Sequence, residues 1–403
     1  MKQNIALVMG GYSGEFEVSI ASGNQVYEQL DHTKYNVYKI VITREGWYWV
    51  DPASGERKVP VDRNDFTVTE HGQKVRFDLA FIIVHGNPGE NGVLQGYFDM
   101  LGVRYTTCGF YTSSLTFHKG YCNPVVASTG LVKTAKSCLL YKEPDNEKLA
   151  ELTADLRYPL FVKPAAGGSS VATTKVKRPE ELMPAIRLAF TEDRQVLVEE
   201  CITGREFDCG VVQFAKGSKY EGWNPDFKHK LVFPITEIIP IGGHEFFDYE
   251  AKYQGFSNEV TPAEVEPEVS KHIQEVSYRL YDLLGCSGIV RFDYIYDEAA
   301  KELYFLEVNT YPGRAPRASC RSRRAPWASV RPSCTSCPSR LRWPNNCFSP
   351  WKKPHRYRPS NCCAPPKAGT APRCPATLRG SPNWLPCATN SLQARNLAGT
   401  TTL

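Results

Sequence analysis

The sequence predicts an α/β protein whose first domain is a doubly wound parallel sheet. Three apolar runs have the length of buried strands: Ile5 to Met9, Val37 to Ile42 and Phe77 to Val84. A helical pattern from Glu15 to Leu30 separates the first two runs. Because strands that alternate with helices are typical of parallel sheets covered on both faces, we place this first domain at residues 1–118.

Beyond residue 118 the pattern starts again, and we expect two further domains, at residues 119–209 and 210–313. Short apolar runs bounded by Gly and Pro predict strands there, and one long amphipathic stretch predicts a helix. The elements expected in these domains are strands at Pro159 to Pro164, Gln195 to Glu200, Gly288 to Ile295 and Leu303 to Asn309, and a helix from about Glu266 to Leu284.

Residues 314–403, called the tail below, differ in composition from the rest of the chain. The tail holds 13 Arg, 3 Lys and no acidic residue, and 8 of the 14 Cys. Because the whole chain carries +5, the tail's +16 leaves −11 for residues 1–313. That negative balance is ordinary for an enzyme, so the basic character belongs to the tail alone.

Three interpretations of the tail compete: a basic arm for nucleic acid, a Cys-rich metal or disulfide module, and translation out of frame. The few Lys disfavour the first, and irregular Cys spacing, with Cys362 next to Cys363, disfavours the second. Codons exist for Arg317 to Ala328 whose shifted frame reads Ser-Ile-Val-Pro-Gln-Gln-Ala-Arg-Ala-Met-Gly, a coherent helical sequence. We therefore expect a frameshift after Gly313 and a disordered tail outside the native fold.

The six Cys of residues 1–313 are scattered, which favours a reduced, cytoplasmic protein. The apolar run near Met1 is too short for a signal peptide or a membrane span. We expect no nucleic-acid partner and no membrane contact for this part of the chain.

Asp293, Glu307 and Asn309 lie on the last two predicted strands. Glu307 and Asn309 are two residues apart, so an extended strand points both to one face. Oxygen ligands from adjacent strands are what Mg²⁺ needs when it bridges the phosphates of a nucleotide. Arg291 shares a strand face with Asp293, where a buried Arg is either paired structurally or stabilises a developing oxyanion. This group predicts an enzyme that uses ATP.

Two Gly-rich loops are candidate ligand contacts. Lys163 followed by Gly167-Gly168-Ser169-Ser170 resembles a phosphate clamp, in which backbone N–H groups wrap phosphate oxygens. The turn from Gly10 to Glu15 places the Glu15 carboxylate at a helix N-terminus, where it can hold an ammonium group. A tight strand-to-helix turn also needs Gly for purely structural reasons.

Acidic and aromatic residues near these loops have two interpretations each. Glu199, Glu200 and Glu206 can accept hydrogen bonds from an adenine amine and ribose hydroxyls, or can form a solvated acidic edge. Lys252 and Tyr253 end an aromatic segment that is either a lid over phosphate or an exposed loop.

Taken in order, these segments resemble D-alanine–D-alanine ligases of the ATP-grasp class from Ile5 to Gly313. The resemblance implies an ATP-grasp fold after the first domain. It also implies ATP-dependent joining of two D-alanines through D-alanyl phosphate, for peptidoglycan precursors. The motifs that carry it are Gly10-Gly11-x-Ser13-x-Glu15-x-Glu17-Val18-Ser19, His85-Gly86-x-x-Gly89-Glu90-x-Gly92-x-x-Gln95-Gly96, Lys163-Pro164 with Gly168-Ser169-Ser170, Glu250-Ala251-Lys252-Tyr253, and Arg291-x-Asp293 with Glu307-x-Asn309-Thr310-x-Pro312-Gly313.

The resemblance assigns roles to individual residues and implies a homodimer. Catalytic roles fall to Glu15, Ser170, Tyr253, Arg291 and Gly313. Substrate binding falls to Glu15 and His85. Two Mg²⁺ or Mn²⁺ ions fall to Asp293, Glu307 and Asn309. The residues implied to bind ATP are Lys119, Lys163, Gly168, Ser169, Glu199, Glu200, Cys201 (through its backbone), Ile202, Glu206 and Lys252.

The chain departs from the family's pattern at two places. Ala172 stands where the family usually has Gly. After Gly313 the family continues with Ser-(Leu/Ile)-Val-Pro, whereas this chain has Arg314 to Ser319. We therefore expect impaired activity of this chain. Two alternatives stay open: a ligase that uses D-lactate or D-serine as second substrate, and an inactive scaffold with a basic tail that binds nucleic acid or metal.

Overall fold

The computed structural model describes residues 2–50, 57–168, 170–214, 227, 230–241 and 257–312. The tail lies outside these residues, so the prediction that it is disordered stays a prediction. Within the described ranges, no helix combines the length and the apolar character needed to cross a bilayer.

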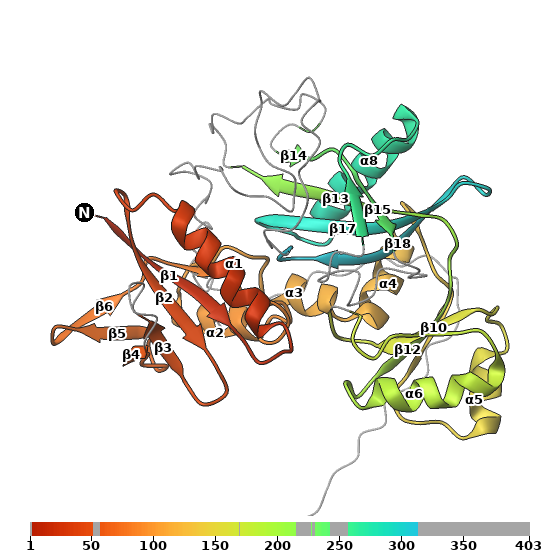
Figure 1. Cartoon of the computed structure of the whole chain (residues 1–403), viewed down its shortest axis with the longest axis horizontal. Coiled ribbons are helices and arrows are strands. Elements are labelled where there is room, and N and C mark those ends of the chain that lie inside the picture. The colour runs from red at the N-terminus through yellow and green to blue at the C-terminus, as the bar shows by residue number, and fades with distance from the viewer. Residues whose placement is uncertain are drawn as a thin grey trace, which may run out of the picture. The chain divides into compact units, whose positions relative to one another are not determined.

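The N-terminal sheet is built around three parallel strands. β1 (Gln3–Gly10) lies between β2 (Tyr35–Ile42) and β7 (Leu79–Ile82), and both pairings are parallel. The strand order is β4-β3-β2-β1-β7. Figure 1 labels β1 to β4 of this sheet, with α1 beside β1 and β2. β3 (Trp47–Val50) and β4 (Arg57–Pro60) extend the sheet in antiparallel fashion. The predicted parallel sheet is confirmed, and the antiparallel extension adds to it.

Both faces of this sheet are covered, which explains why β1 is a continuous apolar run. Ile5, Leu7 and Met9 pack in one cluster with Val26 of α1, while Ala6 and Val8 belong to a cluster on the other face. The remaining elements of this part are two helices and a two-stranded ribbon: α1 (Phe16–Gln29), α2 (Val93–Leu101), β5 (Thr67–Glu70) and β6 (Gln73–Arg76).

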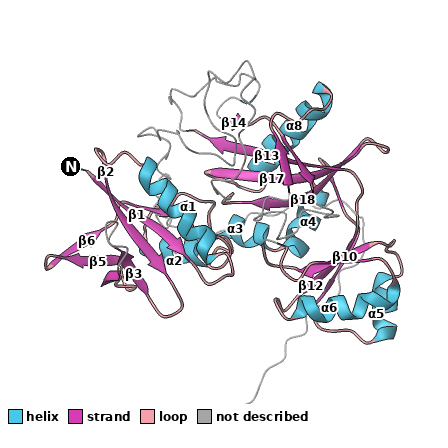
Figure 2. Ribbon diagram, viewed as in Figure 1, coloured by secondary structure: helices cyan, strands magenta, loops and turns pink. Residues whose placement is uncertain are grey.

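The central part is a four-stranded antiparallel sheet in the order β11-β10-β12-β9. Figure 2 shows the helices α5 and α6 beside its strands β10 and β12. Leu182, Ala185 and Ile186 of α6 contribute to the core under this sheet. The elements are β9 (Ser137–Leu140), β10 (Leu160–Pro164), β11 (Thr174–Val176), β12 (Val196–Glu200), α5 (Asn146–Thr153), a 3₁₀ turn (Pro179–Glu181) and α6 (Leu182–Phe190). Before it come α3 (Phe110–Phe117) and α4 (Lys119–Ser128).

The third sheet has seven strands, in the order β16-β15-β13-β17-β18-β8, with β14 paired to β13. Every pairing is antiparallel except that of β18 with β8. The domain boundary predicted at 209/210 falls inside β13. The strands are β8 (Lys133–Thr134), β13 (Arg205–Gln213), β14 (Lys230–Val232), β15 (Thr236–Pro240), β16 (Ser257–Val260), β17 (Ile289–Asp297) and β18 (Glu302–Asn309).

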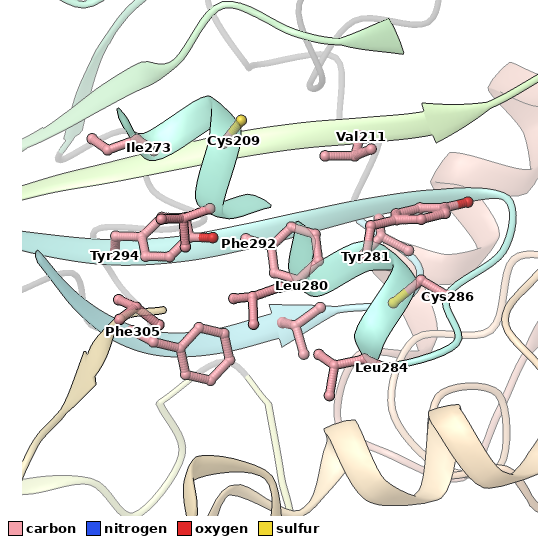
Figure 3. Close-up of a cluster of buried hydrophobic side chains, with 14 of the residues drawn as sticks. Cys209, Val211, Ile273, Leu280, Tyr281, Leu284, Cys286, Phe292, Tyr294 and Phe305 are labelled. Atoms are coloured by element: carbon pink, nitrogen blue, oxygen red, sulfur yellow. The ribbon is translucent and has the colours of Figure 1, made fainter. Parts of the chain in front are cut away.

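One face of β17 lies on the largest hydrophobic cluster, against α8 (Pro267–Leu283). Figure 3 shows Phe292 and Tyr294 of β17 among side chains of that helix. The Tyr294 hydroxyl lies 2.9 Å from the Ser277 hydroxyl, so the buried phenol keeps a polar partner. Because side chains alternate along a strand, Arg291 and Asp293 must lie on the opposite face.

The turn before β17 fixes where that strand starts. Gly288 has φ of +70°, and a Cβ there would lie 2.5 Å from the carbonyl oxygen of Thr106. The neighbouring Ser287 hydroxyl donates to the Thr107 carbonyl at 3.0 Å. Glycine is therefore required at this position by both conformation and space.

Candidate active site

The pairing of β17 with β18 brings four polar side chains into one block. Asp293 is the register partner of Glu307, and Arg291 is the partner of Asn309. Asp293 accepts two hydrogen bonds from Arg291, Nε to Oδ1 at 2.7 Å and Nη2 to Oδ2 at 2.8 Å. The Asn309 amide donates to Asp293 Oδ2 at 3.0 Å. The structure thus brings these predicted site residues together on one face of the sheet.

Because these side chains are buried, each charge strongly affects the pKa values of its neighbours. Burial alone would lower the pKa of Arg291, but the carboxylates of Asp293 and Asp208 outweigh it and raise that pKa well above its ordinary value. Asp208, on β13, is the register partner of Asp293. Burial raises the pKa of Asp208 to about 7, and the Asp293 charge adds to this effect against the opposing Arg291.

The donor set of the block fits a magnesium or manganese ion. Two carboxylates and one amide, from Asp293, Glu307 and Asn309, supply hard oxygens at neighbouring register positions. Mg²⁺ in proteins is usually held by one or two carboxylates plus substrate phosphates, so a complete protein cage is not required. The described residues contain no cluster of three or more His, Cys, Asp or Glu side chains arranged for a metal.

Lys119 links this block to the loop after β10. Its Nζ lies 2.9 Å from Glu307 Oε2 and donates to the Gly167 carbonyl at 2.8 Å. Burial opposes the charged form of Lys119, but the attraction of Glu307 and Glu199 outweighs it and raises the pKa. A cation held between the Glu307 carboxylate and a Gly-rich loop is well placed to contact a phosphate.

Glu199 and Glu200 are neighbours in sequence, but their side chains have different partners. Lys163 on β10 donates to Glu199, and both side chains are largely buried. Glu200 instead pairs with Arg157, whose Nη2 lies 2.9 Å away and whose side chain is 86% exposed. The hydrogen bonds from Arg157 lower the pKa of Glu200. A role for Glu200 at a nucleotide would therefore have to come from its backbone.

The next residues lead from the central sheet into β13. The Cys201 backbone N–H donates to the Pro159 carbonyl at 3.0 Å, and Ile202 follows it in the connection to β13. Glu206 lies two residues before Asp208 on β13, so both point to the face that carries Asp293. The structure thus places Glu206 at the same face of the third sheet as the predicted metal ligands.

Glu15 and His85 come together at the carboxyl ends of the parallel strands. Glu15 precedes the first turn of α1. His85 is 4% exposed, and its Nε2 lies 3.4 Å from the Ser22 hydroxyl of α1. The Ser13 hydroxyl donates to the His85 carbonyl at 2.9 Å and ties the two loops together. Both predicted substrate-binding residues therefore lie on one edge of the first sheet.

The loop after β10 also reaches the edge of the first sheet where Glu15 lies. A Cβ on Gly168 would lie 3.1 Å from Glu15 Oε2, so the two residues nearly touch. Ser170 and Ala172 have φ of +56° and +51°, in the left-handed region that favours glycine. Thus the position where the family usually has Gly does adopt a conformation suited to Gly, although Ala172 occupies it.

Four predicted site residues lie outside the described residues: Ser169, Lys252, Tyr253 and Gly313. The roles assigned to them stay predictions, as does the lid.

Two acidic residues of the site were not singled out from the sequence. Glu90 accepts a hydrogen bond from the Gly86 N–H at 2.7 Å. Burial, and then the Glu15 charge, raise the pKa of Glu90 to about 8. It belongs to the His85-to-Gly96 motif, which was an available signal, whereas nothing in the sequence around Asp208 marks that residue.

Comparison with known proteins identifies the family. The family model described as D-ala D-ala ligase N-terminus matches residues 4–108, and the one described as D-ala D-ala ligase C-terminus matches residues 126–320. The D-alanine–D-alanine ligase of Parabacteroides distasonis is 44% identical over 314 residues, which cover 78% of this chain and 89% of the relative. That of Phocaeicola vulgatus is 41% identical over 315 residues, covering 78% and 91%.

Solved structures agree with these relatives. The D-Ala:D-Ser ligase VanG of Enterococcus faecalis superposes with a TM-score of 0.66 at 33% identity, covering 78% of this chain and 91% of that one. The D-alanyl-alanine synthetase A of Vibrio cholerae gives a TM-score of 0.66 at 27% identity, covering 78% and 90%. The chain therefore belongs to the D-alanine–D-alanine ligase family, whose members are ATP-grasp ligases.

Proposed function

We propose that this protein joins two D-alanine molecules, with ATP cleavage, to form D-alanyl-D-alanine for peptidoglycan precursors. One observation carries the proposal: β17 and β18 hold Arg291, Asp293, Glu307 and Asn309 in one block. This block lies in a chain that is 41–44% identical to D-alanine–D-alanine ligases. Phosphoryl transfer depends on positioning and charge neutralisation, and the block supplies groups for both.

The reaction has two steps. The carboxylate of the first D-alanine attacks the γ-phosphate, which gives D-alanyl phosphate and ADP. The amine of the second D-alanine attacks the acyl carbonyl, and phosphate leaves. In this scheme Arg291 and the Gly313 amide stabilise the tetrahedral oxyanion. Since an acyl phosphate hydrolyses in water, closure of a lid that carries Lys252 would protect it.

Asp293, Glu307 and Asn309 would hold two Mg²⁺ or Mn²⁺ ions, which neutralise phosphate charge when bound. Lys119 and Lys163 contact the phosphates in this proposal. In the structure these lysines pair with Glu307 and Glu199, so their charges already point into the site. The loop residues Gly168 and Ser169 wrap the phosphates, and the adenosine is held by Glu199, Glu200, Cys201, Ile202 and Glu206.

Glu15 holds the ammonium group of the first D-alanine, and His85 lies in the same pocket. The closeness of Glu15 Oε2 to Gly168 supports this arrangement, because a D-alanine bound at Glu15 would have its carboxylate next to the phosphate loop. Ser170 positions Tyr253 and Glu15.

The second substrate is D-alanine rather than D-serine or D-lactate. The relatives named D-alanine–D-alanine ligase are 41–44% identical to this chain, whereas the D-Ala:D-Ser ligase is 33% identical. Competition between D-alanine and D-lactate at two pH values tests this choice. An amine nucleophile must be unprotonated, so D-alanine incorporation should gain at the higher pH.

D-Alanine-dependent ADP formation, with the dipeptide identified by mass spectrometry, tests the activity. We expect magnesium-dependent ATP binding by the chain as written, and full turnover only by a chain whose reading frame is corrected after Gly313. Absence of magnesium-dependent ATP binding in both chains would refute the proposed function. Full turnover by the chain as written would refute only the impairment.

The tail is proposed to result from a frameshift. The C-terminal family match ends at residue 320, which leaves most of the tail beyond it. Sequencing the DNA around codon 313 tests this directly. If the reading frame is intact and the tail retains DNA in a salt-dependent manner, the tail is instead a nucleic-acid-binding segment.

The protein is also proposed to be a cytoplasmic homodimer that binds neither nucleic acid nor membranes. The six Cys among residues 1–313 are all free thiols, which is consistent with a reducing compartment. Light scattering of the frame-corrected chain measures its oligomeric state, and a monomer at micromolar concentration would contradict the dimer.

A further inference from the structure

Arg291 is held by the same carboxylate that a metal ion needs. Both oxygens of Asp293 accept hydrogen bonds from Arg291, and Oδ2 also accepts one from Asn309. The side chains of Arg291 and Asp293 are 22% and 6% exposed, so little water can replace a lost partner. A metal ion that takes Asp293 as a ligand therefore removes the main counter-charge of a largely buried guanidinium.

Glu307 cannot replace Asp293 as the partner of Arg291. It contributes to the charge around the guanidinium, but it is itself proposed as a metal ligand and is paired with Lys119. The new partner of Arg291 must be a carboxylate that lies close to the guanidinium and is not itself a proposed metal ligand.

Asp208 meets this requirement. Its Oδ2 lies 4.0 Å from Arg291 Nε, and its side chain is 11% exposed. Its Oδ1 is buried and has no hydrogen-bond partner among the described residues. The hydroxyl of Thr236, the register partner of Asp208 on β15, interacts with the carboxylate and opposes the rise of its pKa. Asp208 and Asp293 are register partners on β13 and β17, so their side chains lie next to each other on one face. The Arg291 guanidinium nitrogen Nε therefore lies within 4.0 Å of both carboxylates.

We propose that Asp208 is a positioning residue, which takes over the Arg291 guanidinium when Asp293 turns to a metal ion. The inference rests on the proposed function, because it requires metal binding at Asp293. It adds a role for a residue outside the metal, nucleotide and substrate sets. In this arrangement Asp208 keeps Arg291 charged, paired and directed at the reacting centre while its original partner is occupied.

Metal affinity in a double-mutant cycle tests the proposal without any need for turnover. Mn²⁺ binding to the full chain in the presence of ADP is followed by electron paramagnetic resonance. In Asp208→Asn, Arg291 stays on Asp293 and competes with the metal, so Mn²⁺ should bind about tenfold more weakly. In an Arg291→Gln background the competitor is gone, and adding Asp208→Asn should change the affinity less than about twofold.

Each alternative gives a different pattern. If Asp208 is itself a metal ligand, Asp208→Asn weakens binding equally in both backgrounds, and the proposal fails. If its role is only structural, Asp208→Asn lowers the melting temperature and leaves Mn²⁺ affinity unchanged, and the proposal fails again. Asp208→Glu keeps the charge and should retain most of the affinity; a loss as large as that of Asp208→Asn contradicts a role through charge.

Glu237→Gln is the matched control. Glu237 is a buried carboxylate on β15, the neighbour of β13, and pairs with Arg205 at 2.7 Å. Its register partner is Phe207, so it lies on the face opposite to Asp208. Its loss should reduce stability without changing Mn²⁺ affinity. If the unaltered chain binds no Mn²⁺ with ADP, the proposed function itself is refuted, and this inference with it.

Discussion

The strand pairs β10–β12 and β17–β18 both carry acidic residues, but they use them differently. On β12 the two glutamates are adjacent, so Glu199 turns inward to Lys163 and Glu200 turns to the exposed Arg157. On β17 and β18 the polar residues are spaced by two, and Arg291, Asp293 and Asn309 join one network. The spacing of acidic residues along a strand, more than their number, therefore decides whether carboxylates share a site.

The largest effect is expected from Asp293→Asn, which removes the charge at the centre of the β17–β18 network. Magnesium-dependent ADP affinity should fall about 100-fold or more, since loss of outer-sphere partners alone usually costs 10–100-fold. Stability should fall by about 3 kcal/mol, because Arg291 loses its main partner. Titration calorimetry and urea unfolding measure the two effects. Asp297→Asn, at the far end of β17, should leave ADP affinity unchanged; equal losses in both variants would break the comparison.

The two glutamates of β12 offer a matched pair of substitutions. Glu199→Gln should weaken ATP binding about tenfold, because it removes a buried charged acceptor and leaves Lys163 without its partner. Glu200→Gln should change ATP affinity little and stability by about 1 kcal/mol or less, since its partner Arg157 is 86% exposed. Equal effects of the two substitutions on calorimetric ATP affinity would show that strand alternation does not separate their roles.

The negative charge of Glu307 on β18 also acts on Glu90. Burial, then the Glu15 charge and the Glu307 charge, raise the pKa of Glu90 from 4.5 to about 8. A carboxyl whose pKa is higher in the folded state stabilises the fold fully below about pH 4.5, and this contribution is lost as the pH rises through about 8. As the pH rises from about 5 to about 8.5, the free energy of unfolding should therefore fall less for Glu90→Gln than for the unaltered chain. Urea unfolding without ligands measures this, with the exposed Glu143→Gln as control. Parallel pH profiles for all three chains would contradict the prediction.

The smallest effect is expected at Ala172, in the loop after β10. The backbone of Ala172 has φ of +51°, in the left-handed region, whereas the left-handed position before β17 is occupied by Gly288. Ala172→Gly should stabilise the chain by about 0.5 kcal/mol, because the penalty on Cβ exceeds the entropy that Gly loses on folding. Thermal unfolding checks the sign. Ala154→Gly, at a position with φ of −54°, should destabilise, so a loss of stability in both variants would disprove strain at Ala172.

Much of the fold could be predicted because its signals are local. The apolar run in β1 and the helical period of α8 lie close to the predicted bounds. The antiparallel strands β3 and β4 were missed, since they are four-residue segments without a continuous apolar run. Short strands of this kind are stabilised by the sheet they join rather than by their own pattern.

The site likewise contains residues that local spacing predicted and residues that only contacts between distant segments bring in. The spacing of Glu307 and Asn309 predicted a shared face, and the structure places both beside Asp293. Asp208 could not be predicted, because its closeness to Arg291 arises only when β13 pairs with β17. Glu90 belongs to a visible motif, but its raised pKa depends on burial that the sequence does not reveal.

Patterns in the amino-acid sequence were enough to predict the family, the parallel core of the first sheet, and which residues of each strand share a face. The folded chain was needed to show that Asp208 lies beside Asp293 and that Glu200 pairs with Arg157, whereas Lys163 pairs with Glu199. Side-chain alternation is a property of a single strand, whereas register and burial arise from contacts between segments far apart in the chain.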